Sequence, residues 1–243
     1  MEGDGSPRKP PRGLASSGSA ASARRYSLYV GLAFVVLAIV AGINTLTTRE
    51  GSLLGTDPDE RGTPLAPFAV PEALGALTGD ANVFQDDCET SANPCPESER
   101  RTPACEVRGE GVIRVCDHFR RPLVLSFWFT RGGDCLATQD LVDELAARYR
   151  GRVNFLSINV RDDREEVRKI IRDRGWKLPV GYDADGAVAN LYRVGVCPTV
   201  ALAYPGGILA GAAVGADELG EPAFRERIEE LLLESHRREL ESR

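Results

Sequence analysis

The sequence predicts an α/β domain, a central mixed sheet flanked by helices, that follows an N-terminal transmembrane helix. Two patterns indicate the domain. From residue 104 onward, short apolar stretches typical of strands alternate with amphipathic stretches typical of helices. Residues 123–128 are almost continuously apolar, as expected of a strand buried on both faces of a sheet. A third observation is that residues 26–48 carry no charge, and such a run indicates a membrane-spanning helix.

Composition divides the chain before residue 104 into three segments. Residues 1–25 are rich in Gly, Ser, Ala, Pro and Arg, which predicts a disordered cytoplasmic tail. Residues 26–48 are the predicted anchor, because about 20 apolar residues span a bilayer core of roughly 30 Å, and the basic residues before them place the N-terminus in the cytoplasm. A cleaved signal peptide is the alternative, but the apolar run is longer than usual and lacks a good cleavage site. Residues 49–103 are Pro-rich and predict an extracytoplasmic linker, whose apolar residues 65–70 could dock on the domain.

The expected elements of the domain follow along residues 104–235. Strands are indicated by short apolar runs, and helices by apolar residues at helical spacing, such as Val142, Leu145 and Tyr149. The charged residues 236–243 are expected to form a C-terminal tail. In chain order, the expected elements are a hairpin of residue 107 with residues 112–115, a strand at 123–128, a helix after Cys135 that stops at Gly151, a strand at 153–160, a helix at 164–174, a hairpin of 200–204 with 208–211, and a last helix that begins near Pro222.

All six cysteines follow the predicted anchor, and this topology places them in an oxidising extracytoplasmic space, where disulfides form. Cys105 and Cys116 flank the first predicted hairpin, and Cys88 and Cys95 enclose a short loop. We therefore expect these four to form two structural disulfides. A redox role for the four is the alternative.

Charge and histidine content argue against two other classes of function. The net charge is −6, and the basic cluster is confined to the N-terminal tail, which gives no case for nucleic-acid binding. The only histidines, His118 and His236, do not lie at a ligand-like spacing from a cysteine pair. The sequence therefore predicts no metal site and no cofactor.

Several short motifs together resemble one family. They are residues 125–135, Gly175-Trp176, Pro179-Val180, residues 183–186, Tyr192-Arg193-Val194 and Gly195-Val196-Cys197-Pro198-Thr199. With the order of elements, they resemble membrane-anchored thioredoxin-like proteins of the TlpA/ResA type, a group related to alkyl hydroperoxide reductases, over about residues 104–235. The resemblance implies a thioredoxin-like fold and an extracytoplasmic thiol-disulfide oxidoreductase in the cell membrane. Its partners would be exported cysteine-containing proteins or a membrane thiol donor.

The chain departs from these proteins at the cysteine pair itself. Disulfide exchange needs a thiolate nucleophile and a resolving thiol within reach. Where the resembling proteins carry the first cysteine of Cys-x-x-Cys, this chain has Gly132, so that only Cys135 remains. Cys197 precedes Pro198, which matches the cis-proline loop and is expected to lie beside the turn. We therefore expect Cys135 and Cys197 to form a substitute pair, with Cys197 attacking and Cys135 resolving, if their Cα atoms lie about 4.4–6.8 Å apart. The alternative is that Cys135 is a buried, inert thiol or half-cystine.

The resemblance also implies a substrate groove between this turn and the proline loop. The buried acid that some thioredoxins use for proton transfer would fall near Ser126, which cannot act as a base at neutral pH. The expected groove residues are Trp128, Arg131, Gly132, Gly133, Asp134, Pro198 and Thr199.

Three functions are compatible with these residues. The first is a membrane-tethered thiol-disulfide oxidoreductase that uses Cys135 and Cys197. The second is a peroxiredoxin-like peroxidase with Cys135 as the reactive thiol, although Gly132 stands where such enzymes usually carry Thr, and Cys197 stands near the place of their arginine. The third is a non-catalytic thioredoxin-fold module that holds a partner polypeptide in the groove.

Overall fold

The computed structural model describes residues 29–33, 35–37, 54, 61–77, 89–90, 93–94, 102–131 and 134–241. The chain forms two compact units, Met1–Gly51 and Ser52–Arg243. In the first unit, residues 29–33 and 35–37 are helical. None of the helices within the described ranges has the length and apolar character that a membrane span requires. The predicted tail at 1–25 and most of the predicted anchor at 26–48 lie outside the described residues.

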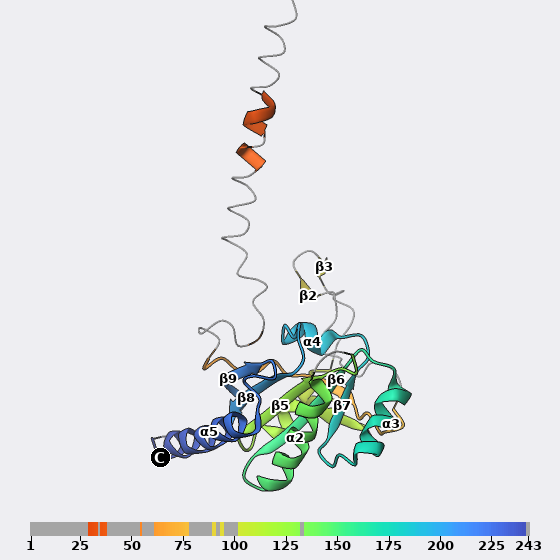
Figure 1. Ribbon diagram of the computed structural model, residues 1–243, viewed down its shortest axis with the longest axis vertical. Helices are drawn as coiled ribbons and strands as arrows, with labels where there is room; N and C mark the ends of the chain where they lie inside the picture. Colours follow the sequence, from red (N-terminus) through yellow and green to blue (C-terminus); the bar gives the residue numbers. More distant parts are fainter. Residues whose placement is uncertain are drawn as a thin grey trace, which may run out of the picture. The chain divides into compact units, whose positions relative to one another are not determined.

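The second unit is built on a five-stranded mixed sheet with the strand order β7-β6-β5-β8-β9 (Figure 1). The central strand β5 pairs in parallel with β6, and β6 in parallel with β7. On its other side, β5 pairs antiparallel with β8, which forms an antiparallel hairpin with β9. The mixed sheet predicted from the sequence is thus confirmed. The strands are β5 (Leu123–Trp128), β6 (Asn154–Val160), β7 (Val180–Asp183), β8 (Thr199–Tyr204) and β9 (Ile208–Val214).

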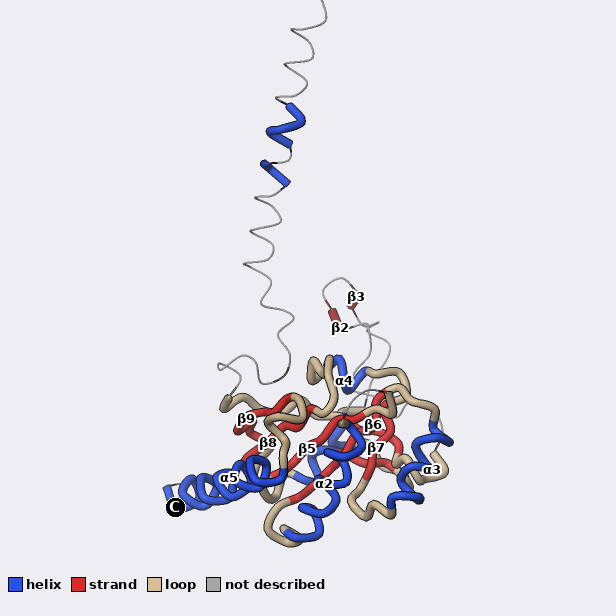
Figure 2. Tube along the Cα trace, in the orientation of Figure 1, coloured by secondary structure: helices blue, strands red, loops and turns tan. Residues whose placement is uncertain are grey.

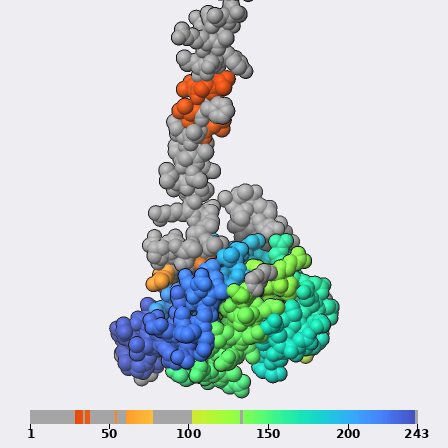
Figure 3. Space-filling view, in the orientation of Figure 1, coloured from red at the N-terminus to blue at the C-terminus, as the bar shows by residue number. Residues whose placement is uncertain are grey.

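Helices cover both faces of the sheet, because β5 is buried along its whole length and needs apolar partners on each side. One face packs against α2 (Cys135–Arg148), α3 (Arg164–Arg174) and α5 (Glu221–Glu241), which lie side by side in Figures 1 and 3. The other face packs against α4 (Ala187–Leu191) and residues from the N-terminal part of the unit. The sheet with its two helical layers positions the loops at its edges.

The helix α3 has the bounds that the sequence predicts. Its N-cap is Asp163, whose carboxylate accepts a hydrogen bond from the backbone N–H of Glu166 at 3.0 Å. It ends at Gly175, which takes the left-handed conformation with φ of 71°.

The prediction is wrong at the C-terminus, where α5 continues to Glu241, so that residues 236–241 are helix and not a separate tail.

The hairpin predicted for residue 107 with residues 112–115 is also wrong. The strand β4 (Val112–Arg114) pairs antiparallel with β1 (Ala69–Pro71), while residues 104–106 form a 3₁₀ turn. The physical reason is burial: β1 brings Val70 into the core, whereas residue 107 is only partly buried and the residues on either side of it are exposed. A separate short pair, β2 (Glu89–Thr90) with β3 (Asn93–Pro94), lies in the segment between β1 and β4.

The linker predicted for residues 49–103 contains a structured part, residues 61–77, which we call the strap. It crosses one face of the sheet, because Pro64 forms a bridge with Ile208 at one edge strand and Glu72 with Gly181 at the other (Figure 2). Phe68 is fully buried in the core beneath it. The docking considered for residues 65–70 therefore extends over the whole strap.

Gly181 makes room for the strap on β7. A Cβ atom at this position would come within 2.6 Å of a methyl group of Val70 and within 2.8 Å of the terminal methyl group of Ile158. Only a residue without a side chain lets Val70 approach the strand this closely. The packing of the strap is therefore built into the sequence of the sheet as well as into the strap itself.

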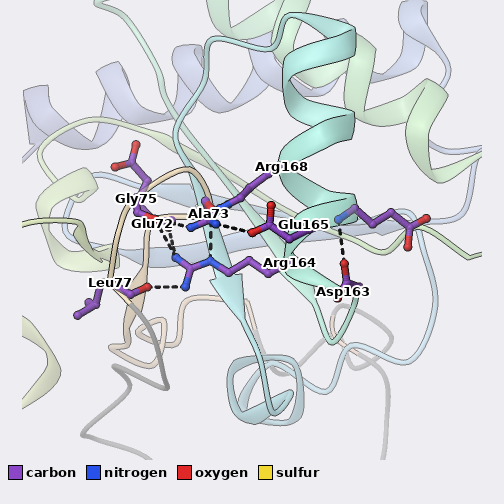
Figure 4. Close-up of polar contacts among 9 residues, drawn as sticks. Glu72, Ala73, Gly75, Leu77, Asp163, Arg164, Glu165 and Arg168 are labelled. Carbon is purple, nitrogen blue, oxygen red and sulfur yellow. Dashed lines mark hydrogen bonds and ion pairs between the residues drawn. The ribbon is translucent and has the colours of Figure 1, made fainter.

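Two arginines of α3 hold the C-terminal end of the strap. Figure 4 shows both guanidinium groups directed at backbone carbonyls of residues 72–77. Arg164 donates to the carbonyls of Glu72 at 3.0 Å, Gly75 at 3.3 Å, Ala73 at 3.5 Å and Leu77; Arg168 donates to Gly75 at 2.6 Å and Ala73 at 3.0 Å. Burial, and then the neighbouring charge of Arg168, lowers the pKa of Arg164. The backbone carbonyl dipoles offset the repulsion between the two neighbouring guanidinium groups.

Candidate active site

Cys135 lies at the N-terminus of α2 and is almost fully buried, with 1% of its surface exposed. The backbone N–H groups and the dipole at a helix N-terminus favour a thiolate over a thiol. Asp134 at the N-cap is exposed and makes no capping hydrogen bond through its side chain. Gly132 and Gly133, which the sequence predicts in the groove, lie outside the described residues.

Cys197 lies in the loop before β8, and its peptide bond to Pro198 is cis. The structure brings Cys197 beside Cys135: their Cα atoms are 5.5 Å apart, and the two sulfurs are joined as a disulfide across a sequence separation of 62 residues. The sulfur of Cys197 lies 3.9 Å from the carbonyl oxygen of Phe127, so the disulfide sits against the C-terminal half of β5. Cys197 is partly exposed, and it is the more accessible of the two sulfur-bearing residues.

Three residues expected in the groove are buried. Trp128 is 1% exposed and packs edge-to-face on Trp176, with 5.1 Å between the ring centroids. Pro198 and Thr199 are also buried, and the Thr199 hydroxyl donates to the carbonyl of Val196 at 2.7 Å. The side chains of these three residues are therefore not exposed at the surface. The exposed residues near the disulfide are Arg131, Asp134 and Val196, the last with 41% of its surface exposed.

Asp162 anchors the start of the turn that precedes α2, and the sequence analysis missed it. Its carboxylate accepts from the backbone N–H of Thr130 at 2.6 Å, from the Thr130 hydroxyl at 2.9 Å and from the Asn159 side-chain amide at 2.7 Å. The carboxyl ends of β5 and β6 meet at the same edge of the sheet because the two strands are parallel. That placement is the signal by which Asp162 could have been found.

Asp183 links the sheet to the segment that carries Cys197. Its buried carboxylate accepts from the backbone N–H groups of Ala189 at 2.9 Å and Val188 at 3.2 Å, at the start of α4. Burial raises the pKa of Asp183 to about 6, although these two hydrogen bonds act in the opposite direction. Protonation of Asp183 therefore changes with pH close to neutrality.

The structure joins two of the other four cysteines. Cys105 and Cys116 form a disulfide with a Cα separation of 5.7 Å. It connects the 3₁₀ turns η2 (Ala104–Glu106) and η3 (Val115–His118) rather than the two strands of a hairpin. Cys88 and Cys95 lie outside the described residues.

Comparison with known proteins gives relatives by sequence and by fold. No protein-family model matches the chain. A thiol-disulfide oxidoreductase ResA of Oceanobacillus iheyensis is 25% identical over 108 residues, which cover 44% of this chain and 56% of the relative. A ResA of Geobacillus kaustophilus is 30% identical over 90 residues, which cover 37% and 52%. The chain thus spans about half the length of the curated relatives it matches.

A solved structure supports the fold independently. The thiol:disulfide interchange protein DsbE from Chlorobium tepidum matches with a TM-score of 0.52 and 19% identity, over 74% of this chain and 99% of that chain. At this identity the likeness concerns the fold, which is the thioredoxin-like α/β fold expected from the sequence. The chain therefore has a thioredoxin-like fold, and over about half of their length it is similar to ResA-type thiol-disulfide oxidoreductases.

Proposed function

We propose that this chain is a thiol-disulfide oxidoreductase that uses Cys135 and Cys197 as its redox pair. The observation that carries the proposal is the 5.5 Å separation of their Cα atoms, which lies inside the range of about 4.4–6.8 Å that a disulfide requires. One cysteine comes from a helix N-terminus and the other from the cis-proline loop. The similarity to ResA proteins, which are named for this activity, supports the same chemistry.

The exposure of the two residues supports different roles for them. In the reducing direction, the Cys197 thiolate attacks one sulfur of a substrate disulfide, forms a mixed disulfide and releases the first substrate thiolate. The Cys135 thiolate then attacks Cys197, closes the Cys135–Cys197 bond and releases the second substrate thiolate. Two electrons pass from the dithiol to the substrate, and a thiol donor restores the dithiol. Oxidation of a substrate dithiol is the same sequence in reverse.

This chemistry would take place outside the cytoplasm. The apolar residues 26–48 would anchor the chain in the cell membrane, with the N-terminus in the cytoplasm and the cysteines in the extracytoplasmic space. Exported cysteine-containing proteins, or a membrane thiol donor, would be the partners in this space. The peroxidase alternative is less favoured, because it makes Cys135 the reactive thiol, and Cys135 is the buried member of the pair.

A trapping experiment tests the assignment of roles. The full chain carrying Cys135→Ser, once reduced, is incubated with an oxidised cysteine-containing peptide and analysed by non-reducing mass spectrometry. It should accumulate a mixed disulfide at Cys197, because the resolving thiol is missing. The Cys197→Ser chain should accumulate none, and the Cys105→Ser/Cys116→Ser double variant should turn over like the parent. In the Cys197→Ser chain, accumulation of a mixed disulfide at Cys135 would refute the roles proposed here.

A further inference from the structure

The face of the sheet under α2 contains a layer of buried polar side chains. Ser126 and Ser157 are partners in the parallel register of β5 and β6, and Trp128 and Asn159 are the next partners on the same face. Gln139 of α2 lies above them, and its Oε1 accepts a hydrogen bond from the Ser126 hydroxyl at 3.0 Å. All five are buried. We call these five residues the polar layer.

Four of the five residues of the polar layer have a side-chain atom without a hydrogen-bond partner. Among the residues that the structure describes, four buried side-chain atoms have no hydrogen-bond partner: Trp128 Nε1, Gln139 Nε2, Ser157 Oγ and Asn159 Oδ1. A buried polar atom without a partner costs about 1–3 kcal/mol. Such a cost is explained when the atom finds a partner in another state of the protein. Gln139 has a fixed orientation, because its carbonyl oxygen accepts the hydrogen bond from Ser126. Its amide N–H group is a donor without a partner.

From the geometry of α2 and the bond to Ser126, we expect the free end of Gln139 to lie near the disulfide. Gln139 follows Cys135 by one helical turn, so the two residues share a face of α2. Long side chains in a helix lean toward its N-terminus, which carries the amide of Gln139 toward Cys135. The disulfide rests against the Phe127 carbonyl, and the residue before Phe127 is Ser126, to which Gln139 is bonded. The amide and the sulfurs therefore lie over adjacent residues of β5.

We propose that Gln139 is a positioning residue of the redox pair: when the disulfide opens, its Nε2–H donates a hydrogen bond to the thiolate of Cys135. This inference rests on the proposed function. A disulfide sulfur is a weak acceptor without charge, whereas a thiolate is a charged acceptor, so the donor lacks a partner in the disulfide state and gains one when Cys135 ionises in the reduced chain. The polar layer has no carboxylate and no histidine. It stabilises the thiolate, while the proton of Cys135 passes to a solvent base before Cys135 attacks Cys197.

A pH titration of thiolate formation tests this inference. The reduced full chain and its Cys135→Ser variant are titrated by the ultraviolet absorbance of the thiolate, and their difference gives the pH midpoint of Cys135. Gln139→Met keeps the length of the side chain but removes the N–H donor. It should raise the midpoint by about one pH unit, a tenfold loss of thiolate at a fixed pH, as expected for one hydrogen bond to a charged group. Thr138→Val, at the adjacent buried polar residue of α2, should leave the midpoint unchanged.

A second readout observes the amide directly. The side-chain amide resonance of Gln139, identified by its loss in Gln139→Met, should shift with pH in the reduced chain and follow the midpoint of Cys135. A midpoint that is unchanged in Gln139→Met would overturn the inference. A lower midpoint would also overturn it, because the carbonyl end of Gln139 would then face the sulfur. A loss of stability alone, equal in Gln139→Met and Thr138→Val, would assign Gln139 to packing.

The two proposals fail in different ways. If the Cys135–Cys197 bond does not open under reduction, the proposed function fails. If the bond opens and the midpoint of Cys135 is insensitive to Gln139, only the role of Gln139 fails. The titration needs no substrate protein, so its outcome does not depend on the choice of partner.

Discussion

The strap and the polar layer are both formed by segments that are distant in sequence, but they treat buried polar atoms differently. At the strap, two arginines of α3 donate to four backbone carbonyls, and Phe68 fills the core beneath. Under α2, the helix that begins at Cys135, four buried side-chain atoms within the described ranges have no hydrogen-bond partner. The comparison teaches that the strap is arranged for stability in one state. The polar layer is arranged for a change of state. Variants of the strap should therefore change the free energy of unfolding, and variants near the disulfide should change its chemistry.

The largest effect on stability is expected at Phe68. Phe68→Ala removes a fully buried ring and should lower the free energy of unfolding by about 3–5 kcal/mol, measured by denaturant titration of the oxidised full chain. Leu74→Ala is the matched control, since Leu74 belongs to the same strap but is 44% exposed, and it should cost less than about 0.5 kcal/mol. Equal costs for the two variants would mean that the strap does not contribute to the core.

The arginine contacts give the next effect. Arg164→Met keeps the aliphatic stem but leaves strap carbonyls without donors, so it should lower the free energy of unfolding by about 2–3 kcal/mol. Hydrogen exchange should then speed up in the strap first. Arg172→Met on the exposed side of α3 serves as the control. If Arg164→Met alters the equilibrium between the dithiol and the disulfide of Cys135 and Cys197 by more than a few-fold, the strap is not a purely stabilising element.

Asp162 is expected to affect both stability and the chemistry of the disulfide. Asp162→Asn replaces one acceptor oxygen by a donor in front of three donors, so it should loosen the start of the turn before α2. We expect a loss of about 1–2 kcal/mol in stability and a slower reaction of Cys197 with a small disulfide reagent, followed by stopped-flow spectroscopy. An unchanged rate at reduced stability would place Asp162 with the strap, as a purely structural group.

The last prediction concerns the pH dependence of stability. Because burial raises the pKa of Asp183 from 3.8 to about 6, the folded chain retains a proton that the unfolded chain has lost between these pH values. The stability from this group is complete below about pH 4 and is lost as the pH rises to about 6, at up to about 1.4 kcal/mol per unit. Asp183→Asn should remove this part of the slope when unfolding free energies are compared across the range. Parallel slopes in the parent and the variant would contradict the assignment.

Local patterns predicted much of the fold because their signals are contained in short stretches. The bounds of α3 follow from the cap at Asp163 and the glycine at 175, and the burial of β5 follows from its apolar run. The strap was predicted as a linker because prolines and scattered charges describe an extended chain. An extended chain can also pair as a strand, as residues 69–71 do with β4, and composition alone does not reveal the pairing.

The candidate site was predictable where the motifs are local. Cys135 and Cys197 were identified from the turn and the proline loop, and the structure brings them together. The polar layer and the role of Asp162 were not predicted, because they depend on the register of the strands. Asn159 lies beside Trp128 only once β5 and β6 are paired. Trp128, Pro198 and Thr199 were expected in the groove from the resemblance, which does not say which side chains face solvent; the structure shows that all three side chains are buried.

The most direct test of the account is the redox equilibrium of the Cys135–Cys197 bond. The full chain is equilibrated in buffers of graded reduced and oxidised glutathione, its thiols are trapped by alkylation, and each cysteine peptide is quantified by mass spectrometry. We predict that the bond between Cys135 and Cys197 opens and closes reversibly at one ratio of reduced to oxidised glutathione, while Cys105 and Cys116 remain joined. A Cys135–Cys197 bond that stays closed throughout, or two cysteines that react independently, would contradict it.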